Sequence, residues 1–95
     1  MNLEILKKAI DQFGFENQTE MIKEECLELA LALQKLKRNP CDINVDNVID
    51  EIADVSIMIE QANIMFPTDL IQKRIEYKID RLQKRIGNFN PKKDA

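Results

Sequence analysis

Proline and glycine occur at only five positions in this 95-residue chain, and the segments between them read with helical periodicity. The predicted helices run over about 3–13, from after Thr19 to about Arg38, over about 45–65, and from an N-cap at Thr68 or Asp69 to Gly87. No stretch combines the alternation and the turn residues of a strand. The pattern therefore predicts an all-α fold of about four helices.

Length and hydropathy indicate one small domain. The chain is 44% apolar and 33% charged, and its size is near the lower limit for a single core. We expect one domain over residues 1–95, with 88–95 as a flexible tail. No run approaches the roughly 18 apolar residues of a membrane span, and residues 1–10 do not resemble a secretory signal. These features predict a cytoplasmic protein with no membrane partner.

The composition excludes several kinds of chemistry. The chain has no histidine, which excludes Ser/His and Cys/His nucleophile pairs. Without histidine, Cys26 and Cys41 cannot complete a zinc site, so we expect free thiols. The net charge is −3, but residues 1–68 carry about −7 and residues 69–95 about +4. This asymmetry predicts a cation site beside an anion site, with no nucleic-acid partner.

Paired carboxylates lie within apolar helical stripes. Glu25 and Glu28 are one turn apart in the second predicted helix, and Glu51 and Asp54 repeat this spacing in the third. Carboxylates among apolar side chains are costly unless a partner compensates them. Oxygen ligands favour Mg²⁺ or Mn²⁺, and the lack of histidine argues against a di-iron site. The alternative is ordinary surface charge.

A row of cations follows in the last predicted helix. It consists of Arg74, Lys78, Arg81 and Arg85. Such a row suits phosphate oxygens. The alternative is a solvated cationic face, although Glu76 and Asp80 are spaced to pair with Lys73 and Lys84 and would leave the row without helical partners.

Two further features have alternative interpretations. Gln18 lies seven residues before Glu25 on the same face, where it either contacts a base or sugar or is a satisfied amide at the helix start. Phe13, Phe15, Met58 and Met65 either line a base pocket or belong to the core. The second predicted helix is also apolar on more than one side, because Leu27 and Leu31 lie away from its main stripe. We expect a dimer or tetramer to cover them, the alternative being a monomer with exposed leucines.

The order of these motifs resembles a known family. The stretch Glu24-Glu25-Cys26-Leu27-Glu28-Leu29, followed by Glu51-Ile52-Ala53-Asp54, is similar to the E-E-x-x-E and E-x-x-D signature of the MazG-like nucleoside triphosphate pyrophosphohydrolases. The helix with Tyr77-Lys78, Arg81 and Arg85 is similar to the basic last helix of that family. The resemblance extends over about residues 12–87.

This resemblance implies an all-α, Mg²⁺-dependent enzyme that forms dimers or tetramers. It would cleave a nucleoside triphosphate between the α- and β-phosphates, giving the monophosphate and pyrophosphate. By this resemblance the metal ligands are Glu25, Glu28, Glu51 and Asp54, the residues acting on water are Glu24 and Glu25, and the substrate-binding residues are Lys78, Arg81 and Arg85. Gln18 is a further candidate for substrate binding from its helical position alone. The family often has asparagine where this chain has Asp80.

Two other functions fit the same residues. In one, the chain is a non-enzymatic assembly module whose acidic cluster forms intersubunit salt bridges with the basic helix. In the other, the metal site acts on a different pyrophosphate-containing substrate, such as a phosphoribosyl-linked nucleotide.

Overall fold

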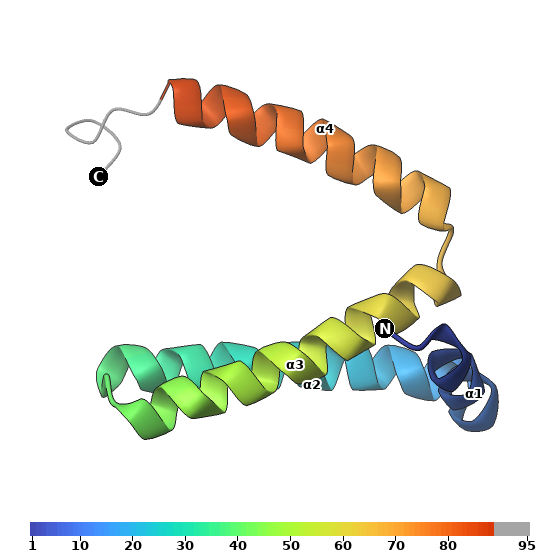
Figure 1. Cartoon of the computed structure of the whole chain (residues 1–95), viewed down its shortest axis with the longest axis horizontal. Coiled ribbons are helices and arrows are strands. Elements are labelled where there is room, and N and C mark those ends of the chain that lie inside the picture. The colour runs from blue at the N-terminus through green and yellow to red at the C-terminus, as the bar shows by residue number, and fades with distance from the viewer. Residues whose placement is uncertain (89–95) are drawn as a thin grey trace. The chain divides into compact units, whose positions relative to one another are not determined.

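The computed structural model describes residues 1–88, which form four α-helices and no strand (Figure 1). The helices are α1 (Leu3–Phe13), α2 (Phe15–Arg38), α3 (Asp42–Met65) and α4 (Thr68–Gly87). The predicted all-α class and helix number are confirmed. The predicted flexible tail lies outside the described residues, apart from Asn88. No helix in the described part of the chain is long and apolar enough to cross a membrane.

The chain divides into two compact units, residues 1–65 and the part from residue 66 onward, and each is described by itself. In the first unit, α2 and α3 lie side by side as an antiparallel hairpin (Figure 1). Helix α1 packs against both of them. The second unit contains α4. The first unit therefore holds all four predicted metal ligands on one hairpin.

The hairpin is built on a seam of positions spaced alternately three and four residues apart, the spacing of a coiled coil. The seam consists of Gln18, Ile22, Glu25, Leu29, Ala32 and Leu36 on α2, and Asn44, Val48, Glu51, Val55, Met58, Ala62 and Met65 on α3. All of these residues are buried or half-buried. Apolar side chains supply most of the contact. Glu25 and Glu51 occupy seam positions that a coiled coil fills with apolar residues.

Gly14 joins α1 to α2, and α2 starts earlier than predicted. Its φ of 89° is in the left-handed region that favours glycine, so it ends α1, as predicted, and α2 begins at the next residue. The predicted start after Thr19 is wrong. The Thr19 hydroxyl donates to the Phe15 carbonyl oxygen at 2.8 Å, so this side chain lies inside the helix and does not cap it.

The other helix starts also differ in detail from the prediction. Helix α3 begins at Asp42, three residues before the predicted Val45, which leaves a short loop around Pro40. The expected cap of α4 by Thr68 or Asp69 is wrong, because Pro67 is the N-cap residue and no side chain caps this end. Cys26 and Cys41 are exposed free thiols, as expected.

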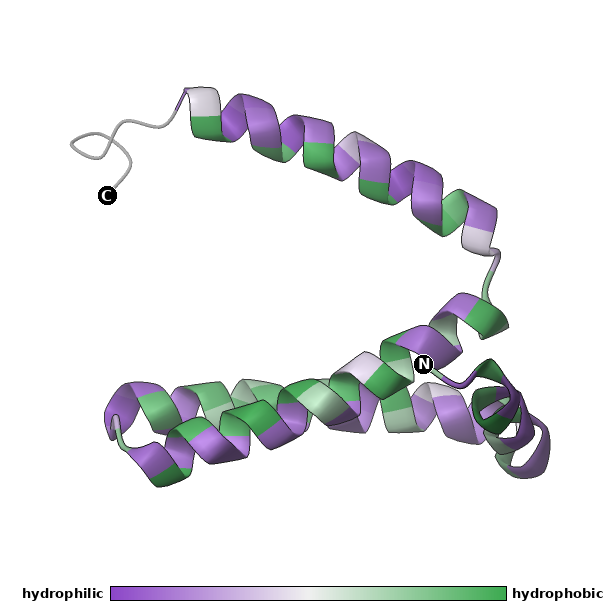
Figure 2. Cartoon of the chain, in the orientation of Figure 1, coloured by the Kyte–Doolittle hydropathy of each residue, from purple (hydrophilic) through white to green (hydrophobic). Residues whose placement is uncertain are grey.

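Large apolar side chains remain exposed on the hairpin. Leu27 and Leu31 are exposed, in agreement with their predicted position away from the main stripe. A second set on α3, which we call the α3 stripe, consists of Val45, Ile49, Ile52 and Ile59, and all four are exposed. Apolar residues recur along the whole length of α3 in Figure 2. Contiguous apolar surface of this kind is typical of an assembly interface.

Gln18 and Gln61 form a buried pair across the hairpin. Both side chains are 5% exposed, and Gln18 Nε2 donates to Gln61 Oε1 at 2.6 Å. Gln18 is a seam residue and Gln61 lies next to the seam, so a polar contact stands here where most of the seam is apolar. Such a contact fixes the register of α2 against α3, because a shifted register would leave both amides without a partner.

We expect Gln18→Leu to lower the free energy of unfolding by about 1–3 kcal/mol, because Gln61 would remain buried without a partner. Replacing both glutamines with leucine is expected to restore part of this loss, since neither polar group then remains. Urea unfolding of the metal-free single and double variants measures the coupling. A double variant less stable than either single variant would contradict this account.

Candidate metal centre

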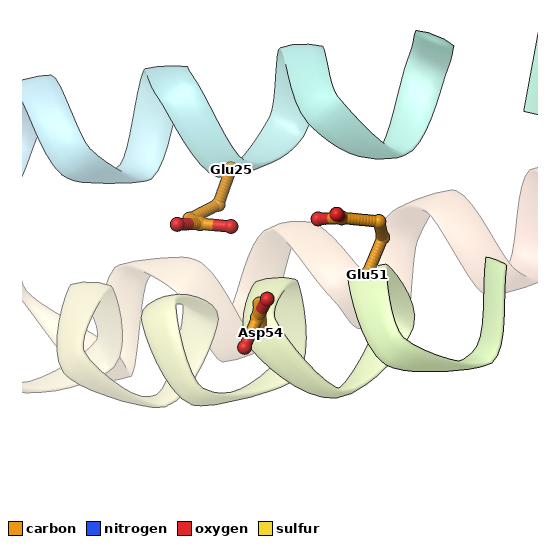
Figure 3. A group of neighbouring side chains, drawn as sticks. All are labelled: Glu25, Glu51 and Asp54. Carbon is orange, nitrogen blue, oxygen red and sulfur yellow. The ribbon is translucent and has the colours of Figure 1, made fainter. Parts of the chain in front are cut away.

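Three carboxylates meet in the middle of the hairpin. Glu25 extends from α2, and Glu51 and Asp54 extend from successive turns of α3 (Figure 3). One oxygen atom from each residue lies within 4.8 Å of the other two. Glu25 and Glu51 are half-buried and Asp54 is exposed. We call these three residues the carboxylate triad.

No basic side chain among residues 1–88 forms an ion pair with the triad. The ion pairs of residues 1–88 are Lys23 with Glu20 and Lys84 with Asp80, and both lie outside the triad. In addition, Glu51 Oε2 is buried and has no hydrogen-bond partner. An unpaired buried carboxylate oxygen is unfavourable unless another ligand binds it. The triad therefore has the oxygen ligands of a cation site, including one oxygen that no protein group binds.

Desolvation and the closeness of the carboxylates raise the pKa values of two members of the triad. Desolvation raises the pKa of Glu51 above its ordinary value, and the charges of Glu28, Asp54 and Glu25 raise it further. The pKa of Glu25 is also raised, first by desolvation and then by Asp54, Glu28 and Glu24. A bound cation would reverse these effects by favouring the ionised carboxylates.

The fourth predicted ligand lies beside the triad. Glu28 is exposed and is not one of the three carboxylates whose oxygens approach each other. Its charge acts on both Glu25 and Glu51, which places it in the same electrostatic cluster. Glu24 is likewise exposed and outside the triad, although its charge acts on Glu25. The catalytic role of Glu24 and the ligand role of Glu28 stay predictions.

Two clefts flank the triad along the hairpin. The first, the Phe13 cleft, has a volume of about 420 Å³ and is lined by Phe13, Asn17, Gln18, Met21, Glu24 and Met58, among others. The second, the Lys35 cleft, has a volume of about 290 Å³ and is lined by Glu28, Lys35, Arg38, Asn44, Asn47 and Glu51, among others. The first contributes aromatic and methionine side chains, and the second contributes two cations, two amides and the carboxylates of Glu28, Asp50 and Glu51.

Gln18 belongs to the lining of the Phe13 cleft, but its amide is already engaged. The amide is satisfied, as the alternative proposed, but its partner is Gln61 on α3 and not a group at the start of α2. A direct contact between Gln18 and substrate stays a prediction. Met58 is buried and Phe13 is exposed, so this cleft combines a core side chain with an accessible aromatic ring.

The predicted phosphate-binding residues lie on α4, in the second unit. Within residues 1–88, Arg74, Lys78, Arg81 and Arg85 form no ion pair, whereas Lys84 Nζ lies 3.2 Å from Asp80 Oδ2. Of the two predicted pairs, Asp80 with Lys84 forms and Glu76 with Lys73 does not, and the row has no ion-pair partner among the described residues. Arg74 and Lys78 also line a cleft along α4 with Leu70 and Ile75. Phosphate binding by the row stays a prediction.

The raised pKa values of Glu25 and Glu51 predict how the stability of the metal-free protein changes with pH. The folded protein retains protons that the unfolded chain loses above pH 4.5, the ordinary pKa of a glutamate. The free energy of unfolding contributed by these groups therefore falls as the pH rises from 4.5 through the raised pKa values, and it is constant above them.

We expect the metal-free melting temperature of the wild type, compared with that of Glu51→Gln, to rise as the pH falls from about 7 to about 5. The increase in melting temperature that Mg²⁺ produces should shrink over the same interval, because protons compete with the cation. Melting curves in chelator and in Mg²⁺ across this range measure both effects. Parallel pH profiles for the two proteins would contradict the assignment.

Some residues of this region were not predicted from the sequence. Gln61 was missed, although it lies seven residues after Asp54, just as Gln18 lies seven residues before Glu25. Lys35 was also missed, although it lies seven residues after Glu28 and thus on the same helix face. A search for polar residues at heptad spacing from the acids would have found both.

Comparison with known proteins gave no match, since no family model, no curated protein and no solved structure was found to be similar to this chain. The resemblance to the MazG-like family rests on the motif residues alone. The function is therefore argued from the geometry and chemistry of the hairpin.

Proposed function

We propose that this chain is a Mg²⁺-dependent nucleoside triphosphate pyrophosphohydrolase. The observation that carries the proposal is the carboxylate triad, with an unpaired, buried oxygen of Glu51 between two helices. Carboxylates without histidine or thiolate favour hard cations, and Mg²⁺ commonly completes its coordination with substrate phosphates. A phosphate-bearing substrate follows from the choice of metal.

Each group of site residues has a separate proposed role in the reaction. Glu25, Glu28, Glu51 and Asp54 would hold Mg²⁺, or Mn²⁺ in its place. When bound, the metal polarises phosphoryl oxygens and lowers the pKa of a water ligand. Glu24 and Glu25 orient the water that attacks the α-phosphorus. The bond from that phosphorus to the bridging oxygen then breaks, releasing the nucleoside monophosphate and pyrophosphate.

Further residues of both units are proposed to bind the rest of the substrate. The Phe13 cleft is suited to a nucleobase, because an aromatic ring and methionine side chains line it. Lys78, Arg81 and Arg85 are proposed to neutralise phosphate charge, as the resemblance implies. The α3 stripe would be covered by a second copy of the chain, giving a homodimer or a homotetramer.

The experiment is a panel of nucleoside and deoxynucleoside triphosphates incubated with the full chain and Mg²⁺, with pyrophosphate and orthophosphate detected separately. Pyrophosphate and a nucleoside monophosphate are expected in equal amounts. Orthophosphate as the sole inorganic product would exclude cleavage between the α- and β-phosphates. A phosphoribosyl-linked nucleotide in the panel tests the other pyrophosphate-containing substrate class.

The exposed α3 stripe favours a second candidate, a non-enzymatic assembly module. In that case, the carboxylates pair with cations of a neighbouring chain, and divalent ions leave thermal melting unchanged. The enzyme proposal requires the opposite result, because a ligand that binds only the native state must raise its melting temperature. Melting with and without millimolar Mg²⁺ or Mn²⁺ therefore separates the two functions.

A further inference from the structure

The Lys35 cleft adjoins the triad on the side of the α2–α3 loop. It shares Glu51 with the triad and also includes Glu28, so any cation held by these carboxylates would border the cleft. Lys35 and Arg38 come from the last turns of α2, and Asn47 comes from α3. All of these residues belong to the same compact unit, residues 1–65.

The cations of the cleft are available to a ligand. Within residues 1–88, neither Lys35 nor Arg38 forms an ion pair. Asn44 Nδ2 donates to the Asn39 carbonyl oxygen at 2.9 Å, whereas the Asn47 amide makes no side-chain hydrogen bond in the described part of the chain. The cleft thus offers two cationic groups and an uncommitted amide donor, which suit phosphate oxygens, beside the carboxylates of Glu28, Asp50 and Glu51, which suit the cation that such phosphates carry.

The two clefts lie at opposite ends of the triad. On α2 the Phe13 cleft ends at Glu24, before the triad, and the Lys35 cleft begins at Glu28, after it. On α3 the order is reversed, from Met58 through the triad to Asn47, as an antiparallel hairpin requires. A substrate whose α-phosphate lies at the triad and whose base lies in the Phe13 cleft must extend its other phosphates toward Lys35.

The distance from Lys35 to the carboxylates is short enough for one triphosphate to contact both. Lys35 is seven residues after Glu28, which is about 10 Å along the helix axis. Side chains of a helix lean toward its N-terminus, and the N-terminus of α2 lies on the triad side of Lys35. This tendency favours a Lys35 side chain that reaches along the cleft toward the carboxylates.

We propose that the Lys35 cleft binds the β- and γ-phosphates, the part of the substrate that leaves as pyrophosphate, through Lys35, Arg38 and Asn47. This inference rests on the proposed function for its substrate, but the binding site itself is defined on the hairpin. It assigns the pyrophosphate contact to α2 and α3, in addition to the cationic row of α4.

A purely structural role for these cations makes a different prediction. Lys35, Lys37 and Arg38 all lie in the last turn of α2, where cations stabilise the helix dipole. Lys37 is not part of the cleft lining. Lys37→Gln is therefore a matched control, because it removes one charge from the same helix end and leaves the cleft intact.

The experiment titrates inorganic pyrophosphate into the full chain with Mg²⁺ present and measures heat. The double variant Lys35→Gln/Arg38→Gln is expected to bind pyrophosphate at least about tenfold more weakly than the wild type, because charged hydrogen bonds are lost. Lys37→Gln should bind as the wild type does. A second titration with a nucleoside monophosphate should show little difference between wild type and double variant, since the α-phosphate lies at the triad.

Equal pyrophosphate affinity in the double variant and the wild type would overturn the inference. So would a loss of monophosphate affinity in the double variant as large as its loss of pyrophosphate affinity, or an equally large loss of pyrophosphate affinity in Lys37→Gln. Metal-free melting of the three variants reports any loss of fold separately. The inference and the proposed function fail independently. If the wild type hydrolyses nucleotides and the double variant binds pyrophosphate as the wild type does, only the assignment of the cleft is refuted. If the double variant loses pyrophosphate binding but the wild type hydrolyses no nucleotide, only the proposed enzyme function is refuted.

Discussion

Glu51→Gln is expected to reduce Mg²⁺-dependent nucleotide hydrolysis at least about 100-fold in kcat/KM. The substitution keeps the size of the side chain but replaces an ionised carboxylate with a neutral amide. Glu51 lies at the centre of the cluster, since it belongs to the triad, carries the buried unpaired oxygen and lines the Lys35 cleft. Steady-state hydrolysis across a range of Mg²⁺ concentrations measures the loss.

The same variant separates loss of metal from loss of fold. Without metal, Glu51→Gln should melt at a higher temperature than the wild type, because it relieves repulsion by Glu25, Glu28 and Asp54. It should also lose most of the Mg²⁺-induced increase in melting temperature. An assembly module that uses Glu51 in a salt bridge predicts the reverse, a lower melting temperature without metal.

Glu60→Gln is the matched control for this experiment. It makes the same chemical change on the same helix, at a residue outside the triad and outside the lining of both clefts. Its hydrolysis and its response to Mg²⁺ should equal those of the wild type. Wild-type hydrolysis by Glu51→Gln, or an equal loss in Glu60→Gln, would show that the triad does not hold the catalytic metal.

Helix locations were predictable where a residue restricts the backbone. Gly14 ends α1 at the predicted residue, because a positive φ is easily adopted only by glycine. Pro67 similarly separates α3 from α4. The start of α2 was missed by several residues because Thr19 was taken as a cap, whereas its hydroxyl bonds within the helix. Helix ends that depend on which hydrogen bond a small polar residue makes are not determined by its identity.

The acids of the site were predictable for a different reason. Helical spacing places Glu25 among apolar neighbours on α2 and Glu51 among apolar neighbours on α3. That both stripes face each other follows from a short loop between two amphipathic helices. The register of the two helices does not follow from spacing. For this reason the structure distinguishes Glu28, which lies beside the triad, from Asp54, which belongs to it.

The clefts required the structure because each is formed by residues from separate helices. The Lys35 cleft combines cations from the end of α2 with amides from the start of α3. In the sequence, Lys35 and Arg38 read as favourable charges at a helix C-terminus, which is a complete explanation for them. Only the packing of α3 beside them shows that they also border the carboxylates.

The α3 stripe is the surface on which the proposed assembly depends. Ile49 is 59% exposed and Ile52 is 49% exposed, although isoleucine is among the residues most often buried. The core of the first unit is small, with Leu6, Ala32, Val48 and Met58 as its buried apolar residues. In the proposed dimer or tetramer, covering this surface with a second copy would add apolar burial that the small core does not supply.

Ile52→Glu/Ile59→Glu is therefore expected to convert a dimer or tetramer into monomers and to lower its melting temperature strongly. Each buried isoleucine contributes about 1.5–3 kcal/mol, and in a symmetric dimer every substitution occurs twice. Light scattering measures the mass. Ile57→Glu is the matched control, since helical spacing places this exposed residue on the other side of α3 from Ile52 and Ile59, and it should leave the mass unchanged. A wild-type monomer, or a double variant of unchanged mass, would show that the α3 stripe is not the interface.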